Sequence, residues 1–189
     1  SYNKLCKDFI DNEAQVKTKA DAVSQAQIQA GIKSISNKNA TIVLFWIELF
    51  RRNKDVKQSV KELKYNYSLE HLLPQKWEEH WASVPVVDDA GNAIADPETA
   101  KQVRYSKVYS IGNMTLLNSR LNTSLRNYIF SRKIEGEGRK KGIRQYSELW
   151  ITKADIIDRY DRGETVWNEA SITQRENALC CELLEIWKS

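Results

Sequence analysis

The residues best suited to chemistry are an acid and a histidine that stand side by side, Glu70 and His71, and three asparagines further on, Asn113, Asn118 and Asn122. A neutral imidazole accepts a proton at physiological pH, because its pKa lies near 6.5. Carboxylate and amide oxygens are ligands that a hard cation such as Mg²⁺ prefers. The set predicts a site where an imidazole activates water and one divalent cation stabilises negative charge, as hydrolysis of a phosphodiester requires.

The element that carries the acid and the histidine is predicted to be a strand. The run Tyr65–Leu73 is rich in aromatic and apolar residues and stops at Pro74, and a proline ends strand pairing. Neighbouring side chains of a strand point to opposite faces. Glu70 and His71 are therefore expected to converge only where the strand breaks, just before the proline.

Three further pieces follow this strand. Residues 85–99 are rich in Asp, Asn, Gly and Pro, which is typical of an exposed loop. The segments Val103–Ile111 and Met114–Leu117 are strand-like, and apolar spacing from Asn118 to Lys133 predicts a helix. The order is thus strand, loop, strand and helix, with the asparagines at the second strand and on the helix.

Helices are predicted on both sides of this centre. Apolar residues recur at helical spacing within residues 2–64, with a break at Asn37–Asn39, and again within residues 145–189. Two capping boxes are expected to start the last helices, one at Thr152 and one at Ser171. We expect an α+β fold, predominantly helical, divided into residues 1–64, 65–144 and 145–189.

Positive charge is concentrated in one block. The net charge is +4, yet residues 101–144 carry 11 Lys/Arg against 2 Asp/Glu. A clustered basic block is typical of a phosphate-binding surface, although it can also be a solvated face. Within it, Gly136–Gly142 lacks the spacing of a P-loop and is predicted to be a flexible basic loop. The candidate DNA contacts are Arg120, Arg126, Arg132, Lys133, Arg139, Lys140 and Lys141.

Other protein classes find little support. No apolar run approaches the length of a membrane span, and no secretion signal stands at the start. The three cysteines, Cys6, Cys180 and Cys181, form no C-x-x-C pair and are expected to be free thiols, which favours a cytoplasmic protein. The sequence does not begin with Met, as expected for a fragment of a longer protein.

The motifs together resemble a known family. Glu70–Gln75, Gly112–Leu117 and the Phe-x-x-Lys of Phe130–Lys133 resemble the HNH (ββα-metal) nuclease domain, and most closely the C-terminal nuclease domain of GmrSD-type modification-dependent restriction enzymes. The resemblance covers roughly residues 66–133. It implies a ββα-metal core, DNA cleavage dependent on one Mg²⁺ or Mn²⁺ ion, a role in defence against phage, and a separate N-terminal nucleotide-hydrolysing and sensing module.

The same resemblance implies residue roles. His71 would be the general base, Glu70 and Asn122 the metal ligands, and Asn113 a brace for the loop that carries His71. Asn118 is an alternative for either asparagine role. Two other functions remain open: a catalytically inactive nucleic-acid-binding module, and a helical docking domain for a protein partner. A homo-oligomer is possible, since a double-strand break needs two nicking domains.

Overall fold

The computed structural model describes residues 24–33, 35–54, 63, 65–118, 125 and 127–188. Helices dominate, and two small antiparallel strand pairs complete the structure, so the expected α+β, predominantly helical class is confirmed. Within these ranges no helix is long and apolar enough to cross a membrane.

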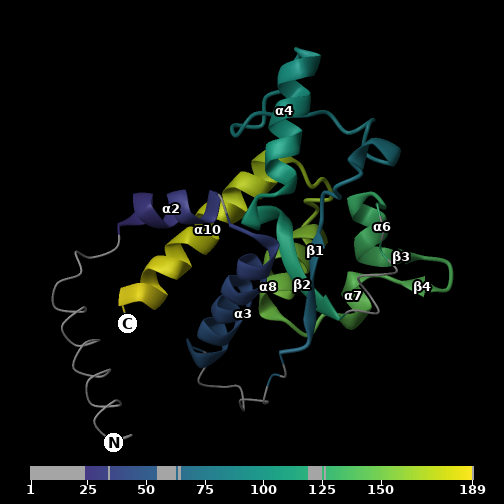
Figure 1. Cartoon of the computed structure of the whole chain (residues 1–189). Helices are drawn as coiled ribbons and strands as arrows, with labels where there is room; N and C mark the ends of the chain where they lie inside the picture. Colours follow the sequence, from purple (N-terminus) through teal and green to yellow (C-terminus); the bar gives the residue numbers. More distant parts are fainter. Residues whose placement is uncertain are drawn as a thin grey trace, which may run out of the picture.

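A two-stranded antiparallel sheet lies at the centre of the fold (Figure 1). Its strands are β1 (Tyr67–His71) and β2 (Met114–Asn118), and the register pairs Glu70 with Thr115 and His71 with Met114. The predicted strand before Pro74 and the predicted strand at Met114 are both confirmed. Because forty-two residues separate the strands, they are not joined by a tight turn, and packing against the surrounding helices holds them together.

The two faces of β2 are buried in two hydrophobic cores. Leu116 packs with α2 (Gln25–Lys33), α3 (Asn37–Lys54) and α10 (Glu169–Lys188). Leu117, the next residue, belongs to the opposite core with Phe130, Ile143 and Trp167. The alternation of a strand thus supplies one residue to each core. Helices come from both ends of the chain, and Figure 1 shows α2, α3 and α10 on one side of β1 and β2, with α6 and α7 on the other.

One predicted strand is a helix. The segment Val103–Ile111 was expected to be extended, but it forms the second half of α4 (Pro97–Val108) and the first residue of the 3₁₀ turn η2 (Ile111–Asn113). The Asp96 carboxylate accepts a hydrogen bond from the Thr99 amide at 2.9 Å, and Pro97 occupies the first helical turn. The Asp and Pro that suggested a loop are therefore the cap that starts this helix.

Two predicted helix starts lie inside longer helices. Thr152 is the last residue of α8 (Trp150–Thr152), which continues through a π-helical turn, η3 (Lys153–Ile157), into α9 (Asp158–Asp161). Its hydroxyl bonds to Thr115 at 2.7 Å, so it is not free to cap. α10 starts at Glu169, where the Asn168 side chain accepts from the Ser171 amide at 3.0 Å. The Thr152 hydroxyl is thus engaged in a tertiary contact, and Asn168 caps the helix three residues before Ser171.

The predicted flexible loop at Gly136–Gly142 is a hairpin. Helix α6 (Phe130–Glu135) leads into β3 (Gly136–Glu137), which pairs with β4 (Lys140–Lys141) before α7 (Ile143–Tyr146). Gly136 has φ +84°, and a Cβ there would lie 2.2 Å from the Lys140 carbonyl oxygen. Glycine is therefore required at this position for the strands to pair.

Candidate active site

Asn113 connects the two strands just beyond their paired ends. Its Oδ1 accepts from the Leu73 amide at 2.8 Å, and its Nδ2 donates to the Leu73 carbonyl at 2.8 Å. The same side-chain amide donates to the Val108 carbonyl at 2.9 Å and accepts from the Trp167 indole at 3.2 Å. The side chain is fully buried, and it fixes the backbone two residues after His71.

Glu70 is buried beside a lysine that the sequence placed among the DNA contacts. Lys133 donates to Glu70 Oε1 at 2.5 Å and to the His71 carbonyl at 2.6 Å, and it has no exposed surface. Burial raises the pKa of Glu70 and lowers the pKa of Lys133, and each effect is partly offset by the opposite charge. One ammonium therefore holds both the candidate metal ligand and the backbone of the candidate base.

His71 has the environment of a neutral imidazole. Its Nε2 is buried and has no hydrogen-bond partner in the part of the chain that the structure describes. Desolvation lowers the pKa of His71 from its ordinary 6.5 to about 4, and the Lys133 charge acts in the same direction. Its ring lies edge-on to that of Tyr109, with 6.1 Å between the centroids. At neutral pH this imidazole is therefore uncharged, and its Nε2 is unpartnered among the described residues.

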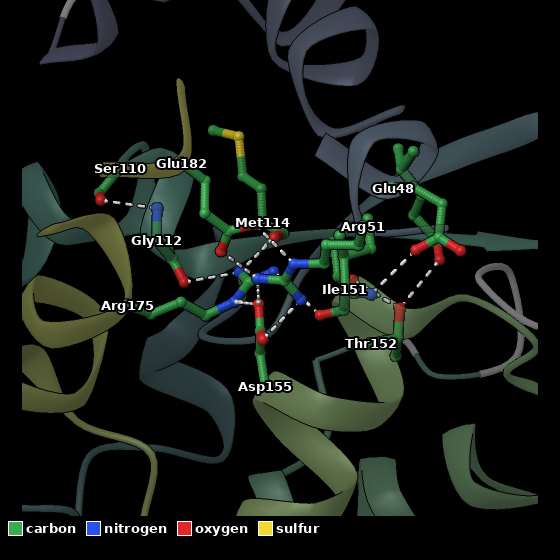
Figure 2. A network of polar contacts seen from close by, with 12 residues as sticks. Glu48, Arg51, Ser110, Gly112, Met114, Ile151, Thr152, Asp155, Arg175 and Glu182 are labelled. Atoms are coloured by element: carbon green, nitrogen blue, oxygen red, sulfur yellow. Dashed lines mark hydrogen bonds and ion pairs between the residues drawn. The ribbon is translucent and has the colours of Figure 1, made fainter. Parts of the chain in front are cut away.

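An arginine from the last helix holds the turn that contains Gly112 and Asn113 (Figure 2). Arg175 donates to the Gly112 carbonyl at 2.9 Å and to the Met114 carbonyl at 2.6 Å, on either side of Asn113. Its Nε also contacts Asp155 at 3.1 Å, and Asp155 in turn binds Arg51. The network joins α3, η3 and α10 to the turn, so the asparagine is held from both sides.

Gly112 is needed because α10 lies against it. A Cβ at this position would be 2.2 Å from the Ile172 carbonyl oxygen and 2.9 Å from the Glu176 amide nitrogen. Those atoms are backbone and cannot move aside without displacing the helix. In this turn, Gly112 is thus required for close packing against α10, and Asn113 is required for its hydrogen bonds.

The predicted DNA contacts differ in their surroundings. Arg139, Lys140 and Lys141 are exposed on the β3–β4 hairpin, which projects from the body in Figure 1, and none of them pairs with a carboxylate of the described residues. Arg132 stacks 3.6 Å from the Tyr128 ring centroid and pairs with Glu137 on the hairpin. Lys133 is buried against Glu70. Arg120 and Arg126 lie outside the described residues.

The candidate metal ligands are described only in part. Asn122 lies outside the described residues, and Asn118 is exposed at the far end of β2, opposite Tyr67 and four residues from the pair His71–Met114. Across the described ranges no three His, Cys, Asp or Glu side chains gather as a metal site. Glu70 offers one carboxylate, whose Oε1 already accepts from Lys133, and a divalent cation that keeps its water shell needs few protein ligands.

Several features of the site had little sequence signal. The ion pair joins residues 63 positions apart, and nothing in a basic segment marks one lysine as buried. Arg175 bonds mainly to backbone carbonyls, which have no side-chain signature in the sequence. His80 is exposed, with its ring centroid 5.8 Å from that of Tyr128. Cys180 is buried, Cys181 is exposed and both are free thiols, as expected.

His71, with its buried Nε2, follows Glu70 in β1, and an exposed basic hairpin lies in the same domain. The family model of the GmrSD restriction endonucleases, C-terminal domain, matches residues 17–181. Since the match spans most of the chain, the protein belongs to this family and is a domain of the restriction endonuclease class. Searches of curated proteins and of solved structures give no match.

Proposed function

We propose that this domain is a divalent-metal-dependent DNA endonuclease of the HNH type, with His71 as general base. The observation that carries the proposal is the buried Nε2 of His71, which has no partner among the described residues and whose lowered pKa keeps the imidazole neutral at pH 7. A neutral imidazole can take a proton from an attacking water. The proposal extends to modification-dependent restriction of phage DNA in the cytoplasm, with sensing by a separate N-terminal module.

The other residues have supporting roles in this proposal. Glu70 and Asn122 would hold one Mg²⁺ or Mn²⁺ ion, which supplies charge stabilisation to the phosphate and the leaving oxygen. Lys133 keeps Glu70 Oε1 in place and fixes the His71 carbonyl. Asn113 fixes the Leu73 backbone and so limits the positions open to the imidazole. Approach of an anionic phosphate would favour the imidazolium form, which helps the base to accept its proton.

The DNA backbone is expected to follow the basic hairpin. Arg139, Lys140 and Lys141 are exposed and unpaired with described carboxylates, so their charges are available to phosphate. Arg132 contacts Tyr128 and pairs with Glu137 on the hairpin, so a phosphate would compete with Glu137 for its guanidinium. Arg120 and Arg126 remain proposed contacts in the segment outside the described residues.

A second candidate function is DNA binding without cleavage. The observation in its favour is the Lys133 ammonium on the Glu70 carboxylate, because a bound lysine already satisfies one of the oxygens that a cation needs. This alternative predicts metal-independent, salt-sensitive binding and no product. A helical docking domain for a protein partner is the third alternative, and it predicts no DNA affinity at low salt.

A plasmid nicking assay separates these functions. Wild type, His71→Ala and the matched control His80→Ala are incubated with supercoiled plasmid and Mn²⁺, Mg²⁺ or EDTA. The endonuclease proposal requires nicking by wild type and His80→Ala, none in EDTA, and a rate roughly 10²–10⁴-fold lower for His71→Ala. Equal rates for wild type and His71→Ala would remove His71 from the mechanism. An inert wild type that still binds DNA favours the binding module.

A further inference from the structure

Two exposed tyrosines on α4 lie next to the candidate base. Tyr109, at the C-terminal end of the helix, has its ring edge-on to His71 at 6.1 Å between centroids. Tyr105, one helical turn earlier, has its ring 5.4 Å from that of Tyr109. Tyr109 is 41% exposed and Tyr105 is 61% exposed. The aromatic pair therefore runs from the base outward along the helix surface.

Packing accounts for little of this pair. The same face of α4 continues to Lys101, which is exposed, and neither tyrosine belongs to either hydrophobic core. The buried side of the helix is formed instead by Arg104 and Val108. Exposed aromatic rings keep apolar area in contact with water, and two in contact form a larger apolar patch than scattered residues do.

The position of the two tyrosines beside His71 indicates which part of a DNA substrate they would contact. A phosphate close enough for attack by a water at His71 brings its own nucleotides within reach of the adjacent Tyr109 ring. The Tyr105 ring, with its centroid 5.4 Å from that of Tyr109, extends the aromatic surface beyond the Tyr109 ring. Aromatic faces stack on nucleobases of any sequence, because every base has a π-face.

We propose that Tyr105 and Tyr109 form a stacking surface for an unstacked nucleobase beside the scissile phosphate, so that the domain favours single-stranded or locally opened DNA over intact duplex. The inference rests on the proposed endonuclease function and names the form of its substrate. It assigns recognition to rings next to the base, whereas the basic hairpin supplies sequence-independent attraction to phosphate.

Binding in EDTA tests the proposal without requiring cleavage. The probe is a single-stranded oligonucleotide that contains 2-aminopurine, with affinity from anisotropy and stacking from fluorescence quenching. Tyr105→Ala and Tyr109→Ala are each expected to weaken binding on the order of tenfold and to reduce the quenching. The two Phe variants should bind as wild type does. Tyr65→Ala, at an exposed tyrosine near the start of β1, is the matched control and should bind as wild type does.

Salt dependence and kinetics separate stacking from other losses. The Tyr variants should keep the wild-type slope of log affinity against log salt, because they remove no phosphate contact. On a single-stranded substrate, Tyr105→Ala should raise KM and leave kcat nearly unchanged, as expected when uniform binding is removed. If Tyr109→Ala does not fold, Tyr105→Ala decides, since its ring is the more exposed.

The outcomes are distinct from those of the nuclease proposal. Nicking that depends on His71, with unchanged binding and KM in both Ala variants, overturns the stacking surface alone. Tyrosine-dependent quenching in a protein that never nicks supports the surface and defeats the nuclease. Phe variants as weak as the Ala variants, or duplex bound more tightly than single strands, would also overturn the inference.

Discussion

The side-chain amide of Asn113 spans the backbone of Leu73, accepting from its N–H and donating to its carbonyl, both at 2.8 Å. The two bonds extend the strand ladder by one side chain beyond the last main-chain bond, in which the Leu72 amide donates to the Asn113 carbonyl at 3.0 Å. Because both atoms of Leu73 are held, the chain leaving β1 can neither slide nor rotate. The position of the candidate base thus depends on an asparagine far from it in sequence.

We predict that Asn113→Ala strongly destabilises the fold. It would leave the Leu73 amide, the Leu73 and Val108 carbonyls and the Trp167 indole without their partner, in a fully buried place. An unsatisfied buried group costs about 1–3 kcal/mol, so a loss of roughly 3–5 kcal/mol is expected after partial relaxation. Urea unfolding measures it, with the exposed Asn39→Ala as control. A change below about 1 kcal/mol would mean that the clamp is dispensable.

The second prediction concerns the buried ion pair. Lys133→Met removes the cation and leaves the Glu70 carboxylate buried, which typically costs roughly 3–5 kcal/mol. Glu70→Gln should cost a comparable amount, because it leaves the ammonium unpaired. The double variant should be less destabilised than the sum of the two, since neither charge is then stranded. Additive losses in urea unfolding would show that the two side chains stabilise the fold independently.

Both strands of the central sheet could be predicted from the sequence, because each is a short apolar run whose pattern lies within the strand itself. The apolar run before Pro74 and the apolar Met114–Leu117 segment each contain the residues that the two cores need. The pattern failed for α4, where Val103, Tyr105 and Val108 suggest a strand while the helix is set by the Asp96–Pro97 start. The helical structure of residues 103–108 is thus determined by a cap that lies before the segment predicted to be a strand.

The candidate site divides in the same way. His71 and Asn113 could be singled out from the sequence, because each is a residue type suited to the chemistry and each stands within a recognisable motif. Lys133 carries no such mark: its helix α6 is basic, and burial comes from the fold placing α6 against β1. Contacts between residues far apart in sequence, such as Lys133 with Glu70 and Arg175 with Gly112, require the folded chain.

The third prediction tests the basic hairpin as a phosphate-binding surface. Replacing Arg139, Lys140 and Lys141 by Ala should reduce the slope of log affinity for duplex DNA against log salt by about 0.9 for each phosphate that is no longer neutralised. A control variant removes the same charge elsewhere, by changing the exposed Lys33, Lys38 and Lys153 to Ala. If the control lowers the slope as much as the hairpin variant does, net charge rather than the hairpin governs binding.

The last prediction follows from the low pKa of His71. The folded pKa of about 4 lies below the ordinary 6.5, so the unfolded chain binds more protons between those values. The stability that neutral His71 contributes is therefore present above pH 6.5 and is lost as the pH falls toward 4. Between pH 7 and pH 5 this group alone should remove about 2 kcal/mol from the free energy of unfolding. His71→Asn has no such titration, so urea unfolding at both pH values should show a smaller acid loss for the variant than for wild type by about that amount. Parallel pH dependences in the two proteins would show that the imidazole has the same pKa in the folded and unfolded chain. The lowered pKa would then no longer support His71 as a neutral general base.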